Sequence, residues 1–453
     1  MRKYRNCEEI KNGLSQKIQF IQAVVVDING IGRGKMFSIE KLADLMNNRE
    51  EITYLIDISG TNSEVPKSIV QSSNGTNGNV IMIPDEETLK IPPWIKNSNV
   101  VMVFCDLYDK STGLPRPFNP RLICKNKLQE LGKLGYRMLI GVEHEFHLFD
   151  KNSKEPFISR FCFDEHFMQT TMALPYAIRM REQALNAGIE FESFNLEAGL
   201  GQIEFPLNAY YGIEAVDKVW IFKELSKYVA NDLGLIASYM TAPLANQPAN
   251  GMHINHSLWK QADNSFLNVF HESSKENELS ELGKHWLAGL LKHSQALSVI
   301  FSPTVNCYRR IRAAVDTTKE INWNYGDRKV AMRVKVSKDE EKMNFIENRL
   351  PSSASNIYLA VAGMIVAGMD GIKNGLELPP INNTNSEKLP ESLSEALEIF
   401  QADKVLVEGL GKDFVDFFIK SKFDTDVNIL KDVDINDITP NGFQKEKEKY
   451  FHL

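Results

Sequence analysis

The sequence is poor in the features that mark secreted, membrane-spanning and disulfide-stabilised proteins. Its five cysteines are an odd number, lie far apart and show no metal-ligand spacing, so we expect reduced thiols. The longest apolar run, residues 357–369, is interrupted by glycines and is too short for a membrane span. Residues 1–11 are charged and lack the apolar core of a secretory signal. We therefore expect a cytoplasmic protein with no membrane partner.

The chain also lacks a strong excess of either positive or negative charge. The 52 basic residues stand against 59 acidic residues, which gives a net charge of −7 and no support for a nucleic-acid partner. A hydrophobic content of 43% and a charged content of 25% are ordinary for a globular protein. The 453 residues are enough for one large domain and one small domain.

The chain is expected to divide at residues 110–117, which are rich in Gly and Pro. Before this hinge the pattern predicts strands and little helix, at 18–28, 51–58, 80–84 and 100–107. After it we expect strands at 141–150 and 252–258 and two strand-like pieces within 189–205, separated by a glycine pair. Helices are expected at 120–135, 169–187, 213–233, 279–301, 356–374 and 393–422. The residues after 422 are interpreted as an ordinary surface tail.

Residues 141–150, Gly-Val-Glu-His-Glu-Phe-His-Leu-Phe-Asp, carry the first functional signal. Apolar and polar residues alternate, as in a half-buried strand, so Glu143, Glu145 and His147 share a face. Two carboxylates on one face repel each other unless a cation lies between them, and oxygen ligands suit Mg²⁺ or Mn²⁺. A solvated edge strand with acidic side chains is the simpler explanation of this segment alone.

Further candidate ligands appear downstream. Glu197 and Glu204 flank a glycine pair, which permits a sharp turn or a close approach of the backbone to a ligand. In residues 250–257 the alternation places His253, Asn255 and Ser257 on one side of a strand and His256 on the other. Four glutamates in strand contexts, with one histidine, make a shared metal site more plausible than any single residue does.

Arginine is the second theme, at positions 309, 310, 312, 328, 333 and 349. Guanidinium groups bind carboxylate and phosphate through paired hydrogen bonds. A basic surface stripe is the alternative, but Arg333 lies in an apolar strand-like segment and is expected to face an anion. Glu347 and Arg349 share a face. Glu347 is therefore a fifth candidate metal-binding carboxylate, next to an arginine that could bind an anion. Metal ligands and arginines together suggest phosphoryl chemistry.

The order of these motifs resembles the glutamine synthetase family from about residue 20 to residue 420. The resemblance rests on residues 27–35, 84–89, 143–146 (Glu-His-Glu-Phe), 197–204 (with Leu200 in place of Pro), 251–253 (Gly-Met-His), 303–310, 347–351 and 356–359. It implies an α+β fold, with an N-terminal β-grasp domain (1–112) and a catalytic domain (113–453) built on a curved antiparallel sheet. It also implies two Mg²⁺ or Mn²⁺ ions, one held by Glu145, Glu197 and Glu204, the other held by Glu143, His253 and Glu347 beside ATP.

Other roles are likewise implied by the resemblance. Gly251, Arg310 and Arg349 would hold the acid substrate; Arg328 and Arg333 would steady the phosphate; Ser257, Arg333 and Lys342 would contact ATP. Family members form homo-oligomeric rings such as dodecamers, in which Asp57 of a neighbouring subunit would bind and deprotonate the ammonium. Asp316 falls at the flap position that closes over this site. ATP would convert a carboxylate, which is a poor acceptor, into an acyl phosphate that an amine then attacks.

The sequence departs from ordinary glutamine synthetase mainly in its substrate loops. Residues 248–250 read Pro-Ala-Asn where the family has Asn-Gly-Ser, and Asp316 replaces a glutamate. Residues 323–328 loosely resemble γ-glutamylpolyamine synthetases, which favours an amine larger than ammonia. The same chemistry on a different acid or amine is therefore the preferred hypothesis. A catalytically degenerate ring protein with a structural or regulatory role, and a metal hydrolase, are the alternatives.

Overall fold

The computed structural model describes residues 18–41, 80–95, 99–109, 112–262, 265–272, 278–313, 318–336, 344–381 and 386–453. The strand predicted at 51–58 and three predicted site residues, Asp57, Asp316 and Lys342, lie outside these ranges. The boundary between residues 112 and 113 stays a prediction.

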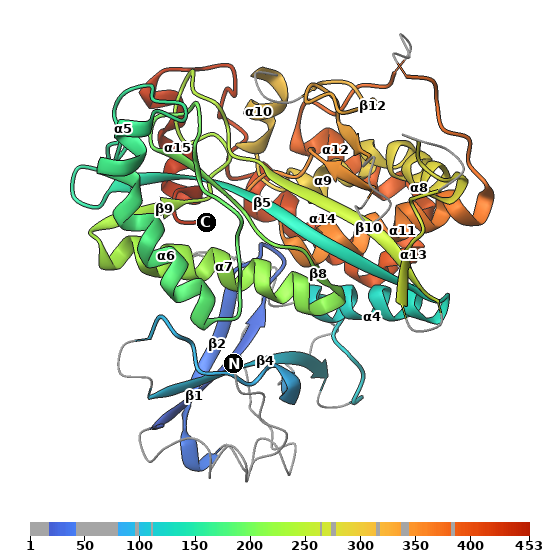
Figure 1. The fold of residues 1–453 in the computed structure, drawn as a ribbon, viewed down its shortest axis with the longest axis horizontal. Coiled ribbons are helices and arrows are strands. Elements are labelled where there is room, and N and C mark those ends of the chain that lie inside the picture. The colour runs from blue at the N-terminus through green and yellow to red at the C-terminus, as the bar shows by residue number, and fades with distance from the viewer. Residues whose placement is uncertain are drawn as a thin grey trace.

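The N-terminal part forms a small sheet, drawn at the bottom of Figure 1. Its described strands are β1 (Phe20–Val26), β2 (Gly32–Ser38), β3 (Val80–Pro84) and β4 (Val100–Asp109), in the order β2-β1-β4-β3. β1 and β2 are antiparallel and turn at Gly30, whose φ of +78° is readily adopted by glycine. β1 pairs with β4 in parallel. Because side chains alternate, one face of β1 has its own apolar cluster and the other face joins the main core.

The larger sheet carries the acidic motifs. Ten described strands form it, with the path β12-β13-β14-β10-β5-β7-β6 and with β8, β9 and β11 paired beside that path. Their bounds are β5 (Tyr136–Asp150), β6 (Asn195–Leu196), β7 (Gln202–Pro206), β8 (Tyr210–Tyr211), β9 (Leu235–Ser238), β10 (Met252–Ala262), β11 (Ser265–Asn268), β12 (Trp323–Tyr325), β13 (Met332–Lys335) and β14 (Phe345–Asn348).

Helices cover this sheet. Their bounds are α4 (Pro120–Lys133), α5 (His166–Met168), α6 (Leu174–Asn186), α7 (Gly212–Asp232), α8 (Glu281–Lys292), α9 (Ser294–Phe301), α10 (Cys307–Ala313), α11 (Ile357–Asn374), α12 (Leu393–Ala402), α13 (Lys404–Leu410), α14 (Lys412–Lys422) and α15 (Pro440–Tyr450). α7 packs on β5 and β9, and α11 packs on α8 and α4. Among the described residues, no helix is both long enough and apolar enough to cross a membrane.

Two predicted helices are broken into shorter ones. The segment predicted as 279–301 is interrupted at His293, whose ring lies between the carboxylates of Asp403 and Asp370. The segment predicted as 393–422 is interrupted at Asp403, which caps α13, and at Gly411, whose φ is +96°. The interruptions depend on contacts between distant segments, which a local pattern does not reveal.

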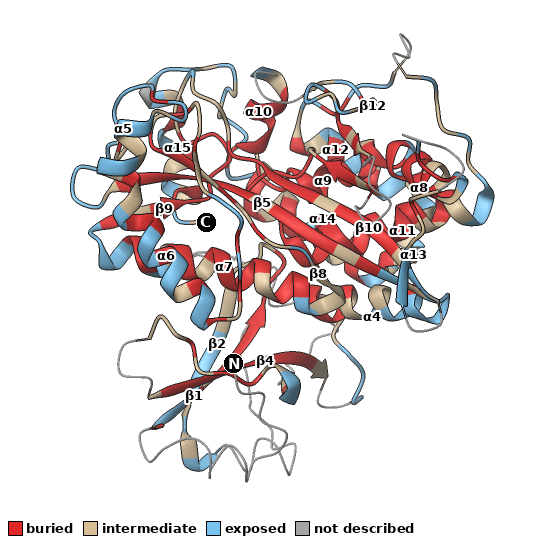
Figure 2. Cartoon of the chain, viewed as in Figure 1, coloured by how far each residue is buried: buried red, intermediate tan, exposed pale blue. Residues whose placement is uncertain are grey.

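β5 is a central strand, not a solvated edge. It pairs with β10 on one side and with β7, β8 and β9 on the other. Figure 2 shows both β5 and β10 buried along most of their length. The half-buried interpretation was therefore wrong, although the alternation assigned the faces correctly: His144 stacks on Phe222 of α7, whereas Glu143 and Glu145 point to the opposite face.

The interpretation of the C-terminal segment as a surface tail was also wrong. Glu446 of α15 is fully buried, and its carboxylate lies 2.7 Å from Nε of Arg309 in α10. Arg309 also donates to the carbonyls of Ile435 and Asp437. The segment looks like a tail because its charges alternate in the sequence, but the ion pair neutralises the two buried charges in the fold.

Candidate active site

Strand register brings the predicted ligands together. In the antiparallel pair β5–β10, Glu143 lies opposite His253, and in β5–β7, Glu145 lies opposite Glu204. In β10–β14, Glu347 lies opposite Asn255. Residues that face each other across antiparallel strands project to the same side of a sheet. Side chains separated by some two hundred residues therefore meet in one row across β14, β10, β5 and β7.

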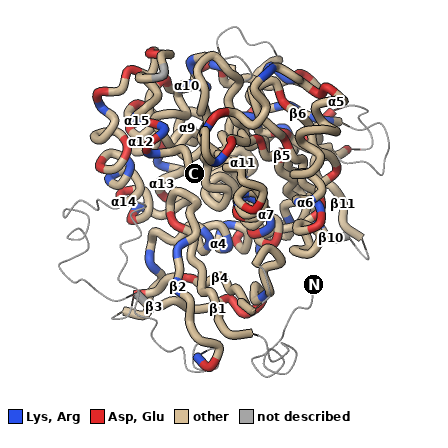
Figure 3. The backbone as a smooth tube through the Cα atoms, turned by 90° about the vertical axis from the view of Figure 1, so that its left-hand side faces the viewer, with Lys and Arg blue, Asp and Glu red and all other residues tan. Residues whose placement is uncertain are grey.

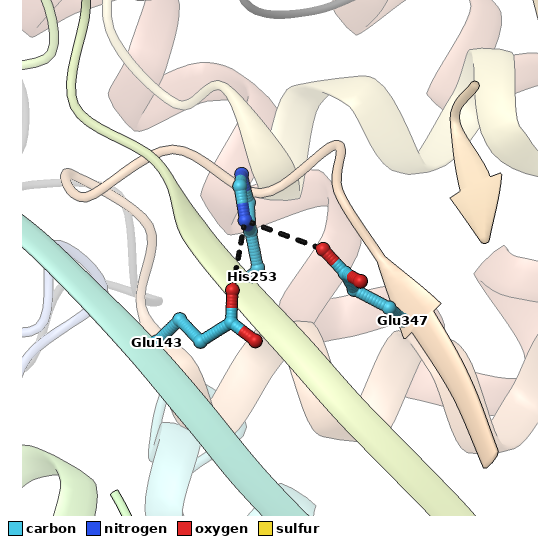
Figure 4. A group of neighbouring side chains, drawn as sticks. All are labelled: Glu143, His253 and Glu347. Carbon is cyan, nitrogen blue, oxygen red and sulfur yellow. Dashed lines mark hydrogen bonds and ion pairs between the residues drawn. The ribbon is translucent and has the colours of Figure 1, made fainter. Parts of the chain in front are cut away.

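Glu143, His253 and Glu347 form one cluster, shown in Figure 4. His253 Nδ1 lies 3.3 Å from Glu143 Oε2 and 3.5 Å from Glu347 Oε1. One potential ligand atom from each of the three residues lies within 4.8 Å of the others. Asn255 Nδ2 donates to Glu143 Oε1 at 2.9 Å, so an amide adjoins the cluster on this side.

Cations surround this cluster on the β13–β14 side. Arg349 Nη1 contacts Glu347 Oε1, Arg333 Nη1 lies 3.1 Å from Glu347 Oε2, and Lys335 Nζ lies 3.0 Å from the same oxygen. Burial opposes ionisation of the carboxyls of Glu347 and Glu143. The neighbouring positive charges nonetheless lower the pKa of Glu347. The hydrogen bond to His253 and the charge of Lys335 hold the pKa of Glu143 well below its usual range.

The second group consists of Glu145, Glu197 and Glu204. Glu145 Oε2 accepts hydrogen bonds from Gly251 N (2.8 Å) and from Gln202 Nε2 (3.3 Å). Burial raises the pKa of Glu204 to about 9, and the charges of Glu145, Glu143 and Glu197 add to this effect. Glu197 follows β6, where its N–H donates to the Gln202 carbonyl.

Glu143, His253 and Glu347 could hold a divalent metal ion, whereas Glu145, Glu197 and Glu204 are not among the described groups whose ligand atoms all lie within 4.8 Å of one another. Crowded, buried carboxylates, such as Glu204 with its raised pKa, are the environment that a hard cation such as Mg²⁺ or Mn²⁺ stabilises. His253 links the two groups, because its Nε2 also lies 3.7 Å from Glu145 Oε1.

A buried polar network behind Glu145 was not predicted from the sequence. His147 Nδ1 lies 2.8 Å from Asn250 Oδ1, and Gln202 Nε2 donates to Asn250 Oδ1 and to Glu145. Burial lowers the pKa of His147 to about 4, so its imidazole is neutral. Asn250, which departs from the family pattern, is thus engaged in the network. Two signals pointed toward it: the alternation places His147 on the same face as Glu145, and it places Gln202 on the same face as Glu204.

The glycines allow this close packing. A Cβ on Gly251 would lie 2.8 Å from His253 Nε2 and 3.2 Å from Glu145 Oε1. A Cβ on Gly199 would lie 2.6 Å from Gln202 Oε1 and 2.8 Å from His147 Nε2. Side chains at these positions would displace the ligand-bearing residues.

The remaining predicted residues are dispersed. Arg310 donates to the carbonyls of Leu350 and Arg349, and Ser257 Oγ accepts from Trp259 Nε1. Arg328 is exposed between β12 and β13. Arg309 and Arg312 serve the C-terminal part of the chain, because Arg309 holds the C-terminal segment and Arg312 contacts the Glu391 carbonyl and Asn436. Figure 3 shows the described acidic and basic residues interspersed along the backbone.

Comparison with known proteins agrees with this geometry. A family model described as "Glutamine synthetase, catalytic domain" matches residues 117–434. A glutamine synthetase of Pyrococcus furiosus is 31% identical over 462 residues, covering 98% of each chain. A glutamine synthetase of Mycobacterium bovis is 28% identical over 365 residues, covering 75% of this chain and 79% of its own.

Among solved structures, one of GmaS without ligand has a TM-score of 0.81 at 23% identity, covering 97% of this chain and 98% of its own. At this identity the likeness shows the fold alone, and it confirms the predicted α+β architecture. The predicted family resemblance is confirmed by the family model and by the relatives. The chain therefore belongs to the glutamine synthetase family of ligases.

Proposed function

We propose that this protein is an ATP-dependent carboxylate–amine ligase that joins glutamate to ammonia or to a primary amine, polyamines included, through γ-glutamyl phosphate. The observation that carries the proposal is the row of Glu204, Glu145, Glu143, His253 and Glu347 across four strands, with Arg333 and Arg349 at one end. A hydrolase would need the metal ligands but not guanidinium groups placed to meet an anion.

The chain's own residues account for the first half of the reaction. A carboxylate oxygen of the acid attacks the γ-phosphorus of ATP, a bond forms to phosphorus, and the bond to the ADP oxygen breaks. Arg333 and Arg349, which now neutralise Glu347, are placed to offset the negative charge of the moving phosphoryl group. Bound Mg²⁺ or Mn²⁺, held by Glu145, Glu197 and Glu204 and by Glu143, His253 and Glu347, would neutralise the phosphates of the nucleotide.

In the second half the amine nitrogen attacks the acyl carbon, and inorganic phosphate leaves with the bonding electron pair. The amine must lose a proton, for which the carboxylate of Asp57 from a neighbouring subunit of a ring is our candidate base. Arg328 is proposed to steady the phosphate together with Arg333, and Asp316 to close over the amine site, where water must be kept from the acyl phosphate. Arg310, Arg349 and Gly251 are proposed to position the acid, and Ser257 and Lys342 to contact ATP.

A substrate panel tests the proposal. Phosphate release from ATP is measured with glutamate, paired with ammonia, methylamine or spermidine, and with glutarate as an acid that lacks the amino group. We expect release that depends on both acid and amine, with kcat/KM at least about tenfold higher for one primary amine than for ammonia, since a single well-placed group is worth about 1.4 kcal/mol. ATP hydrolysis that needs no amine would instead indicate a hydrolase. Bound ATP and Mg²⁺ without turnover for any pair would indicate a degenerate protein.

A further inference from the structure

A cavity of about 650 Å³ lies between the N-terminal sheet and the helices of the larger part of the chain. Its walls come mainly from β3, the short helix η2 (Glu86–Thr88), β4, α4 and α7. The predicted site residues that the structure describes all lie outside these walls. The cavity has the size of a small-molecule site and is separate from the row of carboxylates.

Lys90 carries a buried ammonium in this cavity. The residue is 8% exposed, its backbone pairs with Met102 of β4, and its Nζ lies 5.7 Å from the centre of the Phe104 ring. Within the part of the chain that the structure describes, no carboxylate pairs with this Nζ and no oxygen accepts a hydrogen bond from it. Burial lowers the pKa of Lys90 to about 8, and the attraction of Asp217 does not compensate, because Arg121 repels the same charge.

Asp106 carries a buried charge of the opposite sign. It is 7% exposed, and its Oδ1 is buried without a hydrogen-bond partner in the described ranges. Its ion pair with Arg121 is long, at 3.8 Å. That guanidinium already holds Asp217 through two hydrogen bonds of 3.0 and 2.9 Å and lies 3.0 Å from Asp85. Burial raises the pKa of Asp106, and the charge of Arg121 opposes this rise.

Strand geometry places these two charges on one side of the small sheet. Lys90 lies opposite Met102 in an antiparallel bridge, and Met102, Phe104 and Asp106 alternate along β4. This face turns toward α4, because the Phe104 ring lies 5.1 Å from the guanidinium carbon of Arg121. Four residues of strand, about 13 Å in length, separate Met102 from Asp106. The cavity therefore has a positive end and a negative end.

The remaining charges of the walls are paired with one another or lie in water. Lys125 Nζ is 2.8 Å from Asp85, Lys218 Nζ is 3.3 Å from Glu214, and residues 86–87 are exposed. Among the described wall residues, only the ammonium and the carboxylate at the two ends are both buried and short of a close counter-charge. Such charges destabilise a fold unless something pairs with them, so their presence here indicates a ligand.

We propose that this cavity binds a small zwitterion, an ω-amino acid whose carboxylate pairs with Lys90 and whose ammonium pairs with Asp106. One molecule then supplies a counter-charge at each end. A simple anion would leave Asp106 unpaired, and a simple amine would leave Lys90 unpaired. The inference is independent of the proposed function, because no candidate metal or ATP ligand takes part in it.

Calorimetric titration of the full-length, nucleotide-free protein with ω-amino acids of three to six carbons tests this inference. Each is compared with the carboxylic acid and with the amine of the same chain length, which keep one charge each. We expect one molecule of the best-fitting ω-amino acid to bind per chain, at least about tenfold more tightly than either analogue, because each analogue leaves one buried charge unpaired.

Variants at the two ends locate the site. Lys90→Met and Asp106→Asn should each weaken binding of the ω-amino acid at least about tenfold. Lys90→Met should also raise the melting temperature of the unliganded protein, because it removes a buried, unpaired charge. A purely structural lysine would have the opposite effect on the melting temperature. Lys90→Gln replaces Lys90→Met in the titration if the latter does not fold.

Two further variants serve as controls. Lys133→Met removes an exposed lysine from the end of α4 and should change neither the affinity nor the melting temperature. Glu145→Gln alters the candidate active site and should bind the ω-amino acid as tightly as the wild type does. The absence of saturable binding, equal affinity for a singly charged analogue, or undiminished affinity in the Lys90 and Asp106 variants would overturn the inference.

Discussion

Replacing Glu145 with alanine is expected to abolish divalent-metal binding and ATP cleavage together. Glu145 lies opposite Glu204 and 3.7 Å from His253 Nε2, so its carboxylate touches both groups of candidate ligands. Its loss removes one charge and one donor from the centre of the row. We expect the rate of ATP cleavage to fall about 10³-fold or more, which corresponds to about 4 kcal/mol of lost transition-state stabilisation. Mn²⁺ titration and phosphate release measure the two effects.

Matched variants separate this effect from misfolding. Glu145→Gln keeps an oxygen that can accept the hydrogen bond from Gly251 N but loses the negative charge, and it should show the same double loss while folding normally. Glu182→Ala removes an exposed carboxylate from α6 and should leave both properties intact. ATP cleavage retained by Glu145→Ala would count against the assignment of this carboxylate to a metal site.

The second large effect is expected at Glu347, whose replacement by glutamine should destabilise the fold itself. The carboxylate is fully buried and is contacted by Arg333, Lys335 and Arg349. Removing its charge leaves three cations facing one another beside His253, and breaking a buried ion pair from one side costs about 3–5 kcal/mol. We expect the free energy of unfolding in urea to fall by about 3 kcal/mol or more, with loss of ATP cleavage.

Added phosphate provides the diagnostic readout for this variant. Because the guanidinium and ammonium groups around residue 347 would lack their counter-charge, millimolar phosphate should stabilise Glu347→Gln more than it stabilises the wild type. Glu377→Gln, at an exposed position beyond α11, should lower neither stability nor activity. Equal stability of Glu347→Gln and the wild type would show that the Glu347 carboxylate does not stabilise the fold by pairing with these cations.

Local patterns in the sequence predicted most of the fold because the strands and helices carry strong periodicity. The alternation around Glu143 assigned the correct faces of β5, and antiparallel register then brought Glu143, Glu145, Glu204, His253 and Glu347 together. What the alternation could not show is burial on the polar face, since that burial comes from strands and loops contributed by distant parts of the chain.

Other features were missed for the same reason. The pair of Arg309 and Glu446 spans 137 positions, so the buried charges of α15 looked like a solvated tail. The interruption at His293 depends on Asp370 and Asp403. Lys335 could have been found, because it alternates with Arg333 in a strand-like segment. The role of Asn250 could not, because its partner His147 lies on another strand.

Tracing the side-chain carboxylate oxygen of glutamate tests most directly the claim that ATP activates the acid as an acyl phosphate. Turnover with glutamate labelled with ¹⁸O in its side-chain carboxylate, in the presence of ATP, Mg²⁺ and the preferred amine, should yield inorganic phosphate that carries one ¹⁸O atom, because the carboxylate oxygen stays with phosphorus when the amine displaces it. Phosphate without label would mean that water attacks ATP, and the row of carboxylates and arginines would then serve some chemistry other than activation of an acid.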